Sequence, residues 1–326
     1  MKPGGDHAEL KLNRRAAAIA DAMVVDMEAL GIATATLEGG TRFIDCGIRA
    51  AGGLEAGRLL AEACMGGVGQ VAFGSFDCDG LTLPGVTVRT DHPALACLAS
   101  QYAGWAIKPE GYFAMGSGPL RAVARVEEAL FAYLDYAEPA DGPGVLVLET
   151  REIPGAAALS WIRAKSGVAA ERLTILAAPT ATPAASVQIS ARVVETALHK
   201  LHQLGFNVKK ALTGFGTAPL APIAMNDPRA IGRTNDCVLY GGFVHLTVAG
   251  DDGELAALLP HVPSSASRDY GTPFYDLLKR YDNDFYKIDP MLFSPAEVWL
   301  TSLSSGRTHH AGRVDVEVLK KSLYPE

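Results

Sequence analysis

The 326-residue chain has no apolar run long enough for a membrane helix. None of its stretches approaches the ~20 consecutive apolar residues that cross a bilayer. Near the N-terminus, Asp21, Asp26 and Glu28 interrupt the alanine-rich segment, which argues against a secretory signal. We therefore expect a cytoplasmic protein.

Cysteine is scarce and is not arranged for metal binding. The five cysteines are widely spaced, and no two of them are separated by two residues, as a zinc knuckle would require. Their odd number also argues against a disulfide framework. We expect Cys46, Cys64, Cys78, Cys97 and Cys237 to be small core residues in a reducing compartment.

Charged residues make up 20% of the chain, below the usual ~25%, and the formal net charge is -7. An acidic protein has no global attraction for phosphate backbones, which argues against a nucleic acid as partner. Hydrophobic residues make up 48%, enough for a sizeable core. The length suggests about two domains.

The known nucleotide and nucleophile motifs are also missing. The segment 214–219 (GFGTAP) most resembles a phosphate loop, but it lacks the lysine and hydroxyl residue of a triphosphate site and the dinucleotide fingerprint. It is either a tight turn or an anion loop. No G-x-S-x-G elbow is present, and the spacing of His199 and His202 is not that of a zinc helix.

Strand and helix patterns alternate along the chain, which predicts an α/β fold in two domains. The domains are expected at 1–140 and 141–326, and the segment 298–326 could fold back onto the first. The predicted helices are 13–30, 54–65, 91–102, 119–135, 156–165 and 186–204. The predicted strands are 42–48, 71–76, 144–150, 173–178, 238–240 and 243–249.

The predicted helix 186–204 has two distinct faces. Its apolar residues gather on one side, and Gln188, Arg192, Glu195, His199 and His202 fall within an arc of roughly 80° beside them. One interpretation is a solvated edge with an ordinary Arg192–Glu195 ion pair three residues apart. The other interpretation is a functional surface, because a helix face that is only exposed to solvent would more usually carry lysine and glutamate.

Two loops could hold a polar ligand. The segment 263–271 (PSSASRDYG) brings together serines, an arginine, an aspartate and a tyrosine before a new helix. A serine nucleophile in this loop is the alternative, although the sequence assigns no histidine to it. The segment 116–119 (GSGP) places backbone amides at a helix start, where they either bind an anion or cap the helix.

Six blocks of sequence resemble the methenyltetrahydromethanopterin cyclohydrolase family. They are 52–58 (GGLEAGR), 102–105 (YAGW), 113–119 (FAMGSGP), 186–195 (SVQISARVVE), 232–242 (GRTND with LYGG) and 264–271 (SSASRDYG). The resemblance extends over about 13–323, and the blocks follow the family's order.

This resemblance implies two α/β domains around a large substrate pocket, assembled as a homotrimer. It implies reversible hydrolysis of the methenyl bridge of 5,10-methenyltetrahydromethanopterin to the 5-formyl derivative, in formaldehyde oxidation or methanogenesis, without a metal or redox cofactor. The family's catalytic arginine and glutamate fall on Arg192 and Glu195. Further candidates for binding the pterin carrier are Gln188, Glu55, Arg58, Ser117, Arg233, Ser264, Ser265, Ser267 and Arg268.

The arginines among these candidates, Arg58, Arg233 and Arg268, are either ligands for anionic groups of the carrier or members of structural salt bridges. The chain departs from the family pattern at 180–185 and 221–226, away from the catalytic pair. Two other functions stay open from the sequence. The protein could bind a pterin carrier without catalysis, or it could hydrolyse the methenyl bridge of a folate carrier.

Overall fold

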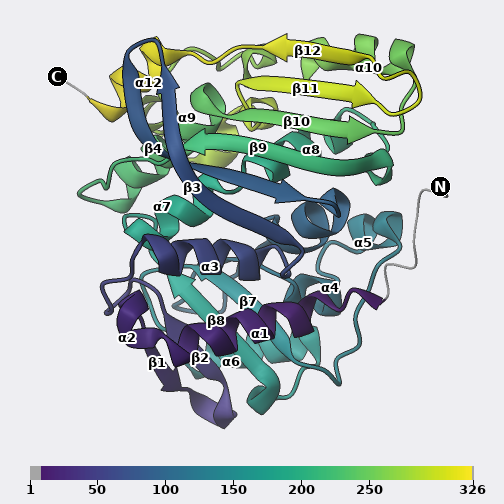
Figure 1. Cartoon of the computed structure of the whole chain (residues 1–326). Helices are drawn as coiled ribbons and strands as arrows, with labels where there is room; N and C mark the ends of the chain where they lie inside the picture. The colour runs from purple at the N-terminus through teal and green to yellow at the C-terminus, as the bar shows by residue number, and fades with distance from the viewer. Residues whose placement is uncertain (1–8, 325–326) are drawn as a thin grey trace. The chain divides into compact units, whose positions relative to one another are not determined.

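The computed structural model describes residues 9–324, which fold into two compact units (Figure 1). Unit A comprises the chain up to Gly69 together with Leu95–Gln188, and unit B comprises Gln70–Ala94 together with the chain from Ile189 onward. Each unit contains one six-stranded sheet with helices, so the predicted α/β fold is confirmed. None of the described helices is long and apolar enough to span a membrane.

The sheet of unit A has a parallel centre and antiparallel edges. Its strand order is β1-β2-β8-β7-β6-β5. The neighbours β2, β8 and β7 run parallel, whereas β1 and β6 pair antiparallel with β2 and β7. The bounds are β1 Ala33–Thr36, β2 Arg42–Asp45, β5 Trp105–Ile107, β6 Ala114–Ser117, β7 Gly144–Glu149 and β8 Leu173–Ala178.

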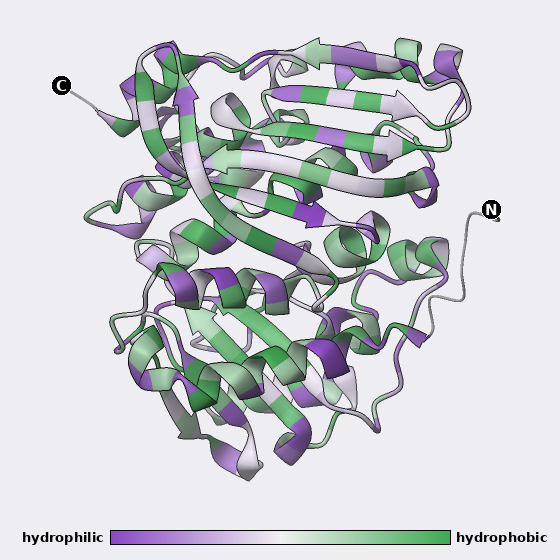
Figure 2. Ribbon diagram, in the orientation of Figure 1, coloured by the Kyte–Doolittle hydropathy of each residue, from purple (hydrophilic) through white to green (hydrophobic). Residues whose placement is uncertain are grey.

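Helices cover both faces of this sheet, which explains why β7 and β8 are apolar along most of their length (Figure 2). Leu146 and Leu148 of β7 pack in one cluster with Leu159 and Ile162 of α6. The helices α1 and α3 pack on β7, and neither contributes to that cluster. The bounds are α1 Leu12–Val25, α2 Met27–Leu30, α3 Leu54–Cys64, α4 Leu120–Ala124, α5 Glu128–Leu134, α6 Ala156–Ser166 and α7 Pro183–Ser190.

The sheet of unit B has the order β12-β11-β10-β9-β4-β3. The neighbours β10 and β11 are parallel, and β9 pairs antiparallel with both β10 and β4. Inward side chains of β10 and β11 alternate with half-exposed ones, as expected for a sheet with one covered face. The bounds are β3 Gly69–Cys78, β4 Leu81–Thr90, β9 Ala211–Pro219, β10 Phe243–Val248, β11 Glu297–Ser302 and β12 Thr308–Gly312.

The helices of unit B pack on this sheet and on one another. Leu319 of α12 and Leu277 of α11 lie in one buried cluster with Leu81 and Leu83 of β4. The bounds are α8 Val193–Gln203, α9 Asp227–Gly241, α10 Asp252–Leu258, α11 Phe274–Arg280 and α12 Val316–Leu323.

The division into units differs from the two continuous domains expected at 1–140 and 141–326. The chain changes unit after Gly69 and again after Ala94, because the hairpin of β3 and β4 joins the sheet of unit B, and it changes unit a third time after Gln188. The C-terminal segment 298–326 contributes β11, which pairs with β10, and α12, which packs beside β4.

Several predicted elements are corrected by the structure. The predicted strand 238–240 is the buried end of α9, which begins after Asn226, whose side chain accepts a hydrogen bond from the Arg229 amide. The predicted helix 119–135 is split into α4 and α5, because Arg125 has a φ of 47°. The segment 94–101 is a π-helix instead of an α-helix. In contrast, the strand 173–178 is confirmed as β8.

A buried carboxyl group joins three helices of unit B. Asp236 of α9 is fully buried and accepts hydrogen bonds from the Phe274 amide at the start of α11, at 2.9 and 3.1 Å. Ser322 Oγ of α12 donates to the same carboxyl group at 2.5 Å. Burial raises the pKa of Asp236 to about 8.

We expect Asp236→Asn to become progressively more stable than the wild type as the pH rises from 5 to 9. The folded pKa of Asp236 lies above its unfolded value, so its contribution is complete below the unfolded pKa and is lost as the pH rises through about 8. An asparagine accepts from the Phe274 amide and donates to Ser322 without titrating. Melting temperatures followed by circular dichroism measure the difference.

The control is Glu317→Gln, which removes an exposed carboxylate from α12. The difference in melting temperature between this control and the wild type should stay nearly constant over the same range. A pH-independent difference for Asp236→Asn would contradict the role assigned to burial.

Candidate active site

The candidate catalytic pair lies at the start of α8. Arg192 occupies the N-cap position of this helix, with φ -81° and ψ 1°, and Glu195 lies in its first turn. Arg192 Nη1 is 3.9 Å from Glu195 Oε2, which is an ion pair longer than a direct hydrogen bond. Glu195 is 5% exposed, and Gln188 is also buried. The interpretation of this arc as a solvated edge is therefore wrong for Glu195 and Gln188.

The predicted helix 186–204 is interrupted immediately before the pair. The helix α7 ends at Ser190, Ala191 and Arg192 form a turn, and α8 begins at Val193. Ser190 Oγ donates to the Pro219 carbonyl oxygen at 2.9 Å, and this bond fixes the end of α7 to the end of β9. The break places Arg192 outside the regular helix, so a helical wheel does not give its true direction.

Two glycines of β9 determine how closely α8 approaches the sheet. A Cβ atom at Gly214 would lie 2.8 Å from Val194 Cγ1, and one at Gly216 would lie 2.9 Å from methyl carbons of both Val193 and Val194. Both interpretations of 214–219, a tight turn and an anion loop, are therefore wrong. These residues form a strand at the centre of the sheet, and the glycines provide space for the helix that carries Glu195.

A buried lysine on α8 went unnoticed in the sequence. Lys200 is 1% exposed, and its Nζ donates to the Met291 carbonyl oxygen. Burial lowers the pKa of Lys200 to about 8, while the charge of Asp289 opposes this shift. A lysine on an amphipathic helix usually lies on the solvent-exposed face. Lys200 and Met291 are 91 positions apart, so no local sequence pattern predicts that this lysine is buried.

We expect Gly216→Ala to reduce turnover because the added methyl group displaces α8 from β9. Overpacking of this kind typically costs ~1–3 kcal/mol of stability. A shift of about 1 Å at a catalytic group can cost ~100-fold in rate. Steady-state kinetics should thus show kcat falling by about 10-fold or more.

The matched control is Gly74→Ala in β3, where an added Cβ meets no atom within 4 Å. Its kcat should equal that of the wild type. Equal kinetics of the two variants would show that the approach of α8 to β9 does not position Glu195.

The serine loop 264–271 is divided between buried and exposed residues. Ser264 Oγ donates to the Leu239 carbonyl oxygen, and Ser267 Oγ donates to Asp289 Oδ2 at 2.7 Å. Both hydroxyls are thus used to hold the loop in place. Ser265 and Arg268 are exposed, and they are the two loop candidates that reach solvent.

The other arginine candidates are engaged within their own units. Arg58 of α3 donates to Glu55 at 2.8 and 2.5 Å and to Glu62 at 2.9 Å, so two carboxylates already neutralise it. This supports the structural interpretation of Arg58. Arg233 of α9 donates to the carbonyl oxygens of Pro222 and Ile223 at 3.4 and 3.2 Å, which fixes the loop before that helix.

Two further candidates lie together in unit A. Ser117 Oγ is 3.2 Å from Cys64 Sγ, and Gln188 Nε2 contacts the same sulfur at 3.9 Å. Ser117 and Cys64 are buried. In the segment 116–119, for which anion binding and helix capping were both open, the Gly118 amide donates to the Ser100 carbonyl oxygen at 2.8 Å. Of the five cysteines, Cys78 is half-buried and the others are buried.

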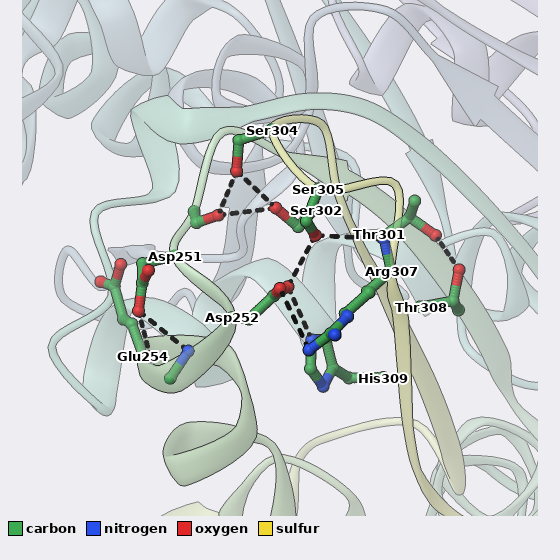
Figure 3. A network of polar contacts seen from close by, with 12 residues as sticks. Asp251, Asp252, Glu254, Thr301, Ser302, Ser304, Ser305, Arg307, Thr308 and His309 are labelled. Carbon is green, nitrogen blue, oxygen red and sulfur yellow. Dashed lines mark hydrogen bonds and ion pairs between the residues drawn. The ribbon is translucent and has the colours of Figure 1, made fainter.

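A cluster of serine, histidine and aspartate lies elsewhere in unit B, where the start of α10 meets the hairpin of β11 and β12 (Figure 3). Asp252 Oδ1 is 3.1 Å from His309 Nε2 and accepts from Ser305 Oγ at 2.8 Å. Ser305 donates to the carboxylate instead of the imidazole, so the histidine does not activate it. The cluster ties the hairpin to α10. In residues 9–324, no group of three or more potential ligand side chains could hold a metal ion.

Comparison with known proteins connects this arrangement with one family. The family model described as Cyclohydrolase (MCH) matches residues 11–323. The chain belongs to the methenyltetrahydromethanopterin cyclohydrolase family. It is 45% identical to the protein of that name from Methylobacillus flagellatus, over 92% of this chain and 91% of that protein. It is 41% identical to the one from Methanocaldococcus jannaschii, over 96% and 98%, and 39% identical to the one from Methanococcoides burtonii, over 96% and 98%.

These cyclohydrolase relatives include proteins from both methanogens and methylotrophs. The match extends through both units and includes α8 with the Arg192–Glu195 pair.

Proposed function

We propose that the protein is a methenyltetrahydromethanopterin cyclohydrolase, with Glu195 and Arg192 as its catalytic residues. Family membership over nearly the whole chain supports the reaction. The observation that supports the residues is a buried carboxylate paired with an arginine at the start of α8. A carboxylate removed from water interacts strongly with a cationic substrate.

The substrate's bridge carbon lies between two nitrogens that share a positive charge, so it is electrophilic without a Lewis acid. Glu195 accepts a proton from a water molecule as the water oxygen bonds to this carbon. The neutral adduct then opens. Glu195 returns its proton to the departing nitrogen, the adduct's hydroxyl proton is released, and the formyl group stays on N5. The net reaction consumes water and releases one proton.

Arg192 positions Glu195 for this proton transfer. A guanidinium group presents a planar fork of donors, which suits a carboxylate better than a point charge does. The separation of 3.9 Å leaves room for this contact to shorten when the substrate binds. Because the chemistry needs only proton transfer and charge stabilisation, the proposal includes no metal or redox cofactor.

We expect Glu195→Gln to lose ~100-fold or more of kcat while KM changes only a few-fold, because the amide cannot accept the proton of water. Decay of the methenyl chromophore measures turnover with the methanopterin carrier, and a parallel assay uses the folate carrier. The control is Glu254→Gln, which removes an exposed carboxylate paired with Lys210.

Full activity of Glu195→Gln would refute the assignment of the base. Binding of the carrier without turnover by the wild type would indicate a carrier-binding protein, and preference for the folate carrier would indicate the other enzyme.

The proposal also includes a cytoplasmic homotrimer, as the family resemblance implies. Several large apolar side chains are exposed on the chain, including Phe113, Phe215 and Met225. Exposed apolar groups of this size are often covered in an assembly. We expect light scattering of the purified protein to give three times the mass of one chain, and the mass of a single chain would contradict the trimer.

A further inference from the structure

A buried lysine ties the helix of the proposed catalytic pair to a segment far along the chain. Lys200 of α8 is 1% exposed, and its Nζ donates to the Met291 carbonyl oxygen. Both residues belong to unit B, as do Arg192 and Glu195, so the tie acts within one compact unit. Burying an ammonium group costs free energy unless the group is paired or hydrogen-bonded, and the Met291 carbonyl oxygen meets this requirement.

The acceptor of this hydrogen bond is itself held in place. Met291 belongs to the short helical turn Pro290–Leu292, which Asp289 caps by accepting from the Met291 amide at 3.0 Å. The same carboxylate accepts from Ser267 Oγ at 2.7 Å, and the Asp289 amide donates to Asp269 Oδ2 at 2.8 Å. The Met291 carbonyl oxygen is therefore a fixed point for Lys200.

Lys200 and Glu195 border the buried stripe of α8 on opposite sides. At about 100° per residue, the fully buried apolar side chains of this helix span roughly 140° of its circumference. They are Val193, Val194, Ala197, Leu198 and Leu201. Lys200 lies just beyond one margin of this stripe, and Glu195 lies beyond the other. A rotation of α8 about its own axis would therefore move both side chains together.

Apolar packing fixes the distance of α8 from the sheet better than it fixes this rotation. Burial of methyl groups is not directional, and Gly214 and Gly216 of β9 have no side chains against which the helix could lock. A hydrogen bond to a fixed carbonyl oxygen is directional. A carboxylate about 5 Å from the helix axis moves about 1 Å when the helix rotates by about 10°. A displacement of that size can cost ~100-fold in rate.

We infer that Lys200 is a positioning residue, whose bond to Met291 sets the rotation of α8 and thereby the place of the Glu195 carboxylate. Lys200 acts through the helix and takes no part in the proton transfers at the bridge carbon. The inference rests on the proposed function, since the catalytic role of Glu195 enters the argument through it. Through Asp289, it also couples α8 to the loop 264–271.

Lys200→Met tests this inference because it keeps an unbranched apolar stem and removes the ammonium group. We expect kcat to fall ~10-fold or more while KM stays within about 3-fold, since the chemical step depends on the place of Glu195. Lys200→Arg keeps a cation that can donate to Met291, so it should retain more of kcat than Lys200→Met. The control is Lys210→Met, which removes a lysine paired with Glu254 outside α8, and its kcat should equal that of the wild type.

The pH profile of kcat is a readout that a purely structural lysine would not move. Burial lowers the pKa of Lys200 to about 8, and the charge of Asp289 opposes this shift. The strands that pack against α8 bury apolar residues and glycines, such as Leu246 and Gly216. On the helix itself, burial lowers the pKa of His202, so this imidazole is neutral near pH 8.

Wild-type kcat should fall as the pH rises through about 8, because a neutral amine holds a carbonyl oxygen less strongly than an ammonium group does. Lys200→Met and Lys200→Arg should lack this decrease, since neither new side chain titrates in the range. Asp289→Asn should move the decrease to lower pH, because it removes the charge that favours the ammonium form.

A crystal structure of Lys200→Met provides a readout that requires no turnover. We expect α8 to be rotated about its axis by about 10°, with the Glu195 carboxylate displaced by about 1 Å relative to β9. The same structure of Lys210→Met should show α8 as in the wild type.

The outcomes separate the two proposals. Wild-type protein without turnover, together with a rotated α8 in Lys200→Met, would refute the proposed function and leave the positioning of α8 by Lys200 standing. Active wild-type enzyme with unchanged kcat in Lys200→Met would overturn the inference alone, and so would an unmoved α8. If Lys200→Met does not fold, the pH profiles decide. A decrease that persists in Lys200→Arg, or that stays at the same pH in Asp289→Asn, would overturn the inference.

Discussion

The close packing of α8 on β9 is the constraint on which the proposed catalytic pair depends. A helix packed on a sheet normally stands off by the thickness of the intervening side chains. Here Gly214 and Gly216 remove that layer, and the branched side chains of Val193 and Val194 fill the space. Because these valines directly precede Glu195 in the first turn of the helix, the sheet fixes the position of the carboxylate through them. The packing thus holds the carboxylate in place, while its 3.9 Å contact with Arg192 can still shorten.

The blocks that carry the family resemblance largely build the scaffold around the site. The block 239–242 joins the block 264–271, because Ser264 donates to the Leu239 carbonyl oxygen and Tyr240 Oη accepts from the Gly271 amide at 3.1 Å. Asp236 joins α9 to α11 and α12, and Gly57 lets α3 contact α7. In this chain, these motif residues therefore meet packing and hydrogen-bonding requirements of the fold.

The sequence predicted the parts of the fold that have a local pattern. The apolar strand 173–178 and the helix 156–165 follow from residue periodicity, and their bounds agree closely with β8 and α6. The strands β4 and β9 went unrecognised because Pro84, Gly85, Gly214 and Gly216 resemble turn residues. Their role in the sheet depends on partners more than 100 positions away, as in the pairing of Val88 with Gly216. The residues of the candidate site were predicted in the same uneven way. Arg192 and Glu195 were found through a helical arc and the resemblance, whereas the burial of Lys200 beside them on α8 depends on a contact distant in sequence.

The chain crosses from one unit to the other three times, and this order has a consequence for its synthesis on the ribosome. The hairpin of β3 and β4 is made early, but β4 pairs with β9, whose residues emerge more than 100 positions later. During that interval unit A can complete its own sheet, because all of its strands precede α7. The hairpin meanwhile presents an unpaired strand edge, a surface that can join the edges of other nascent chains. The order of the strands thus leaves one edge of β4 without its partner until β9 has been synthesised.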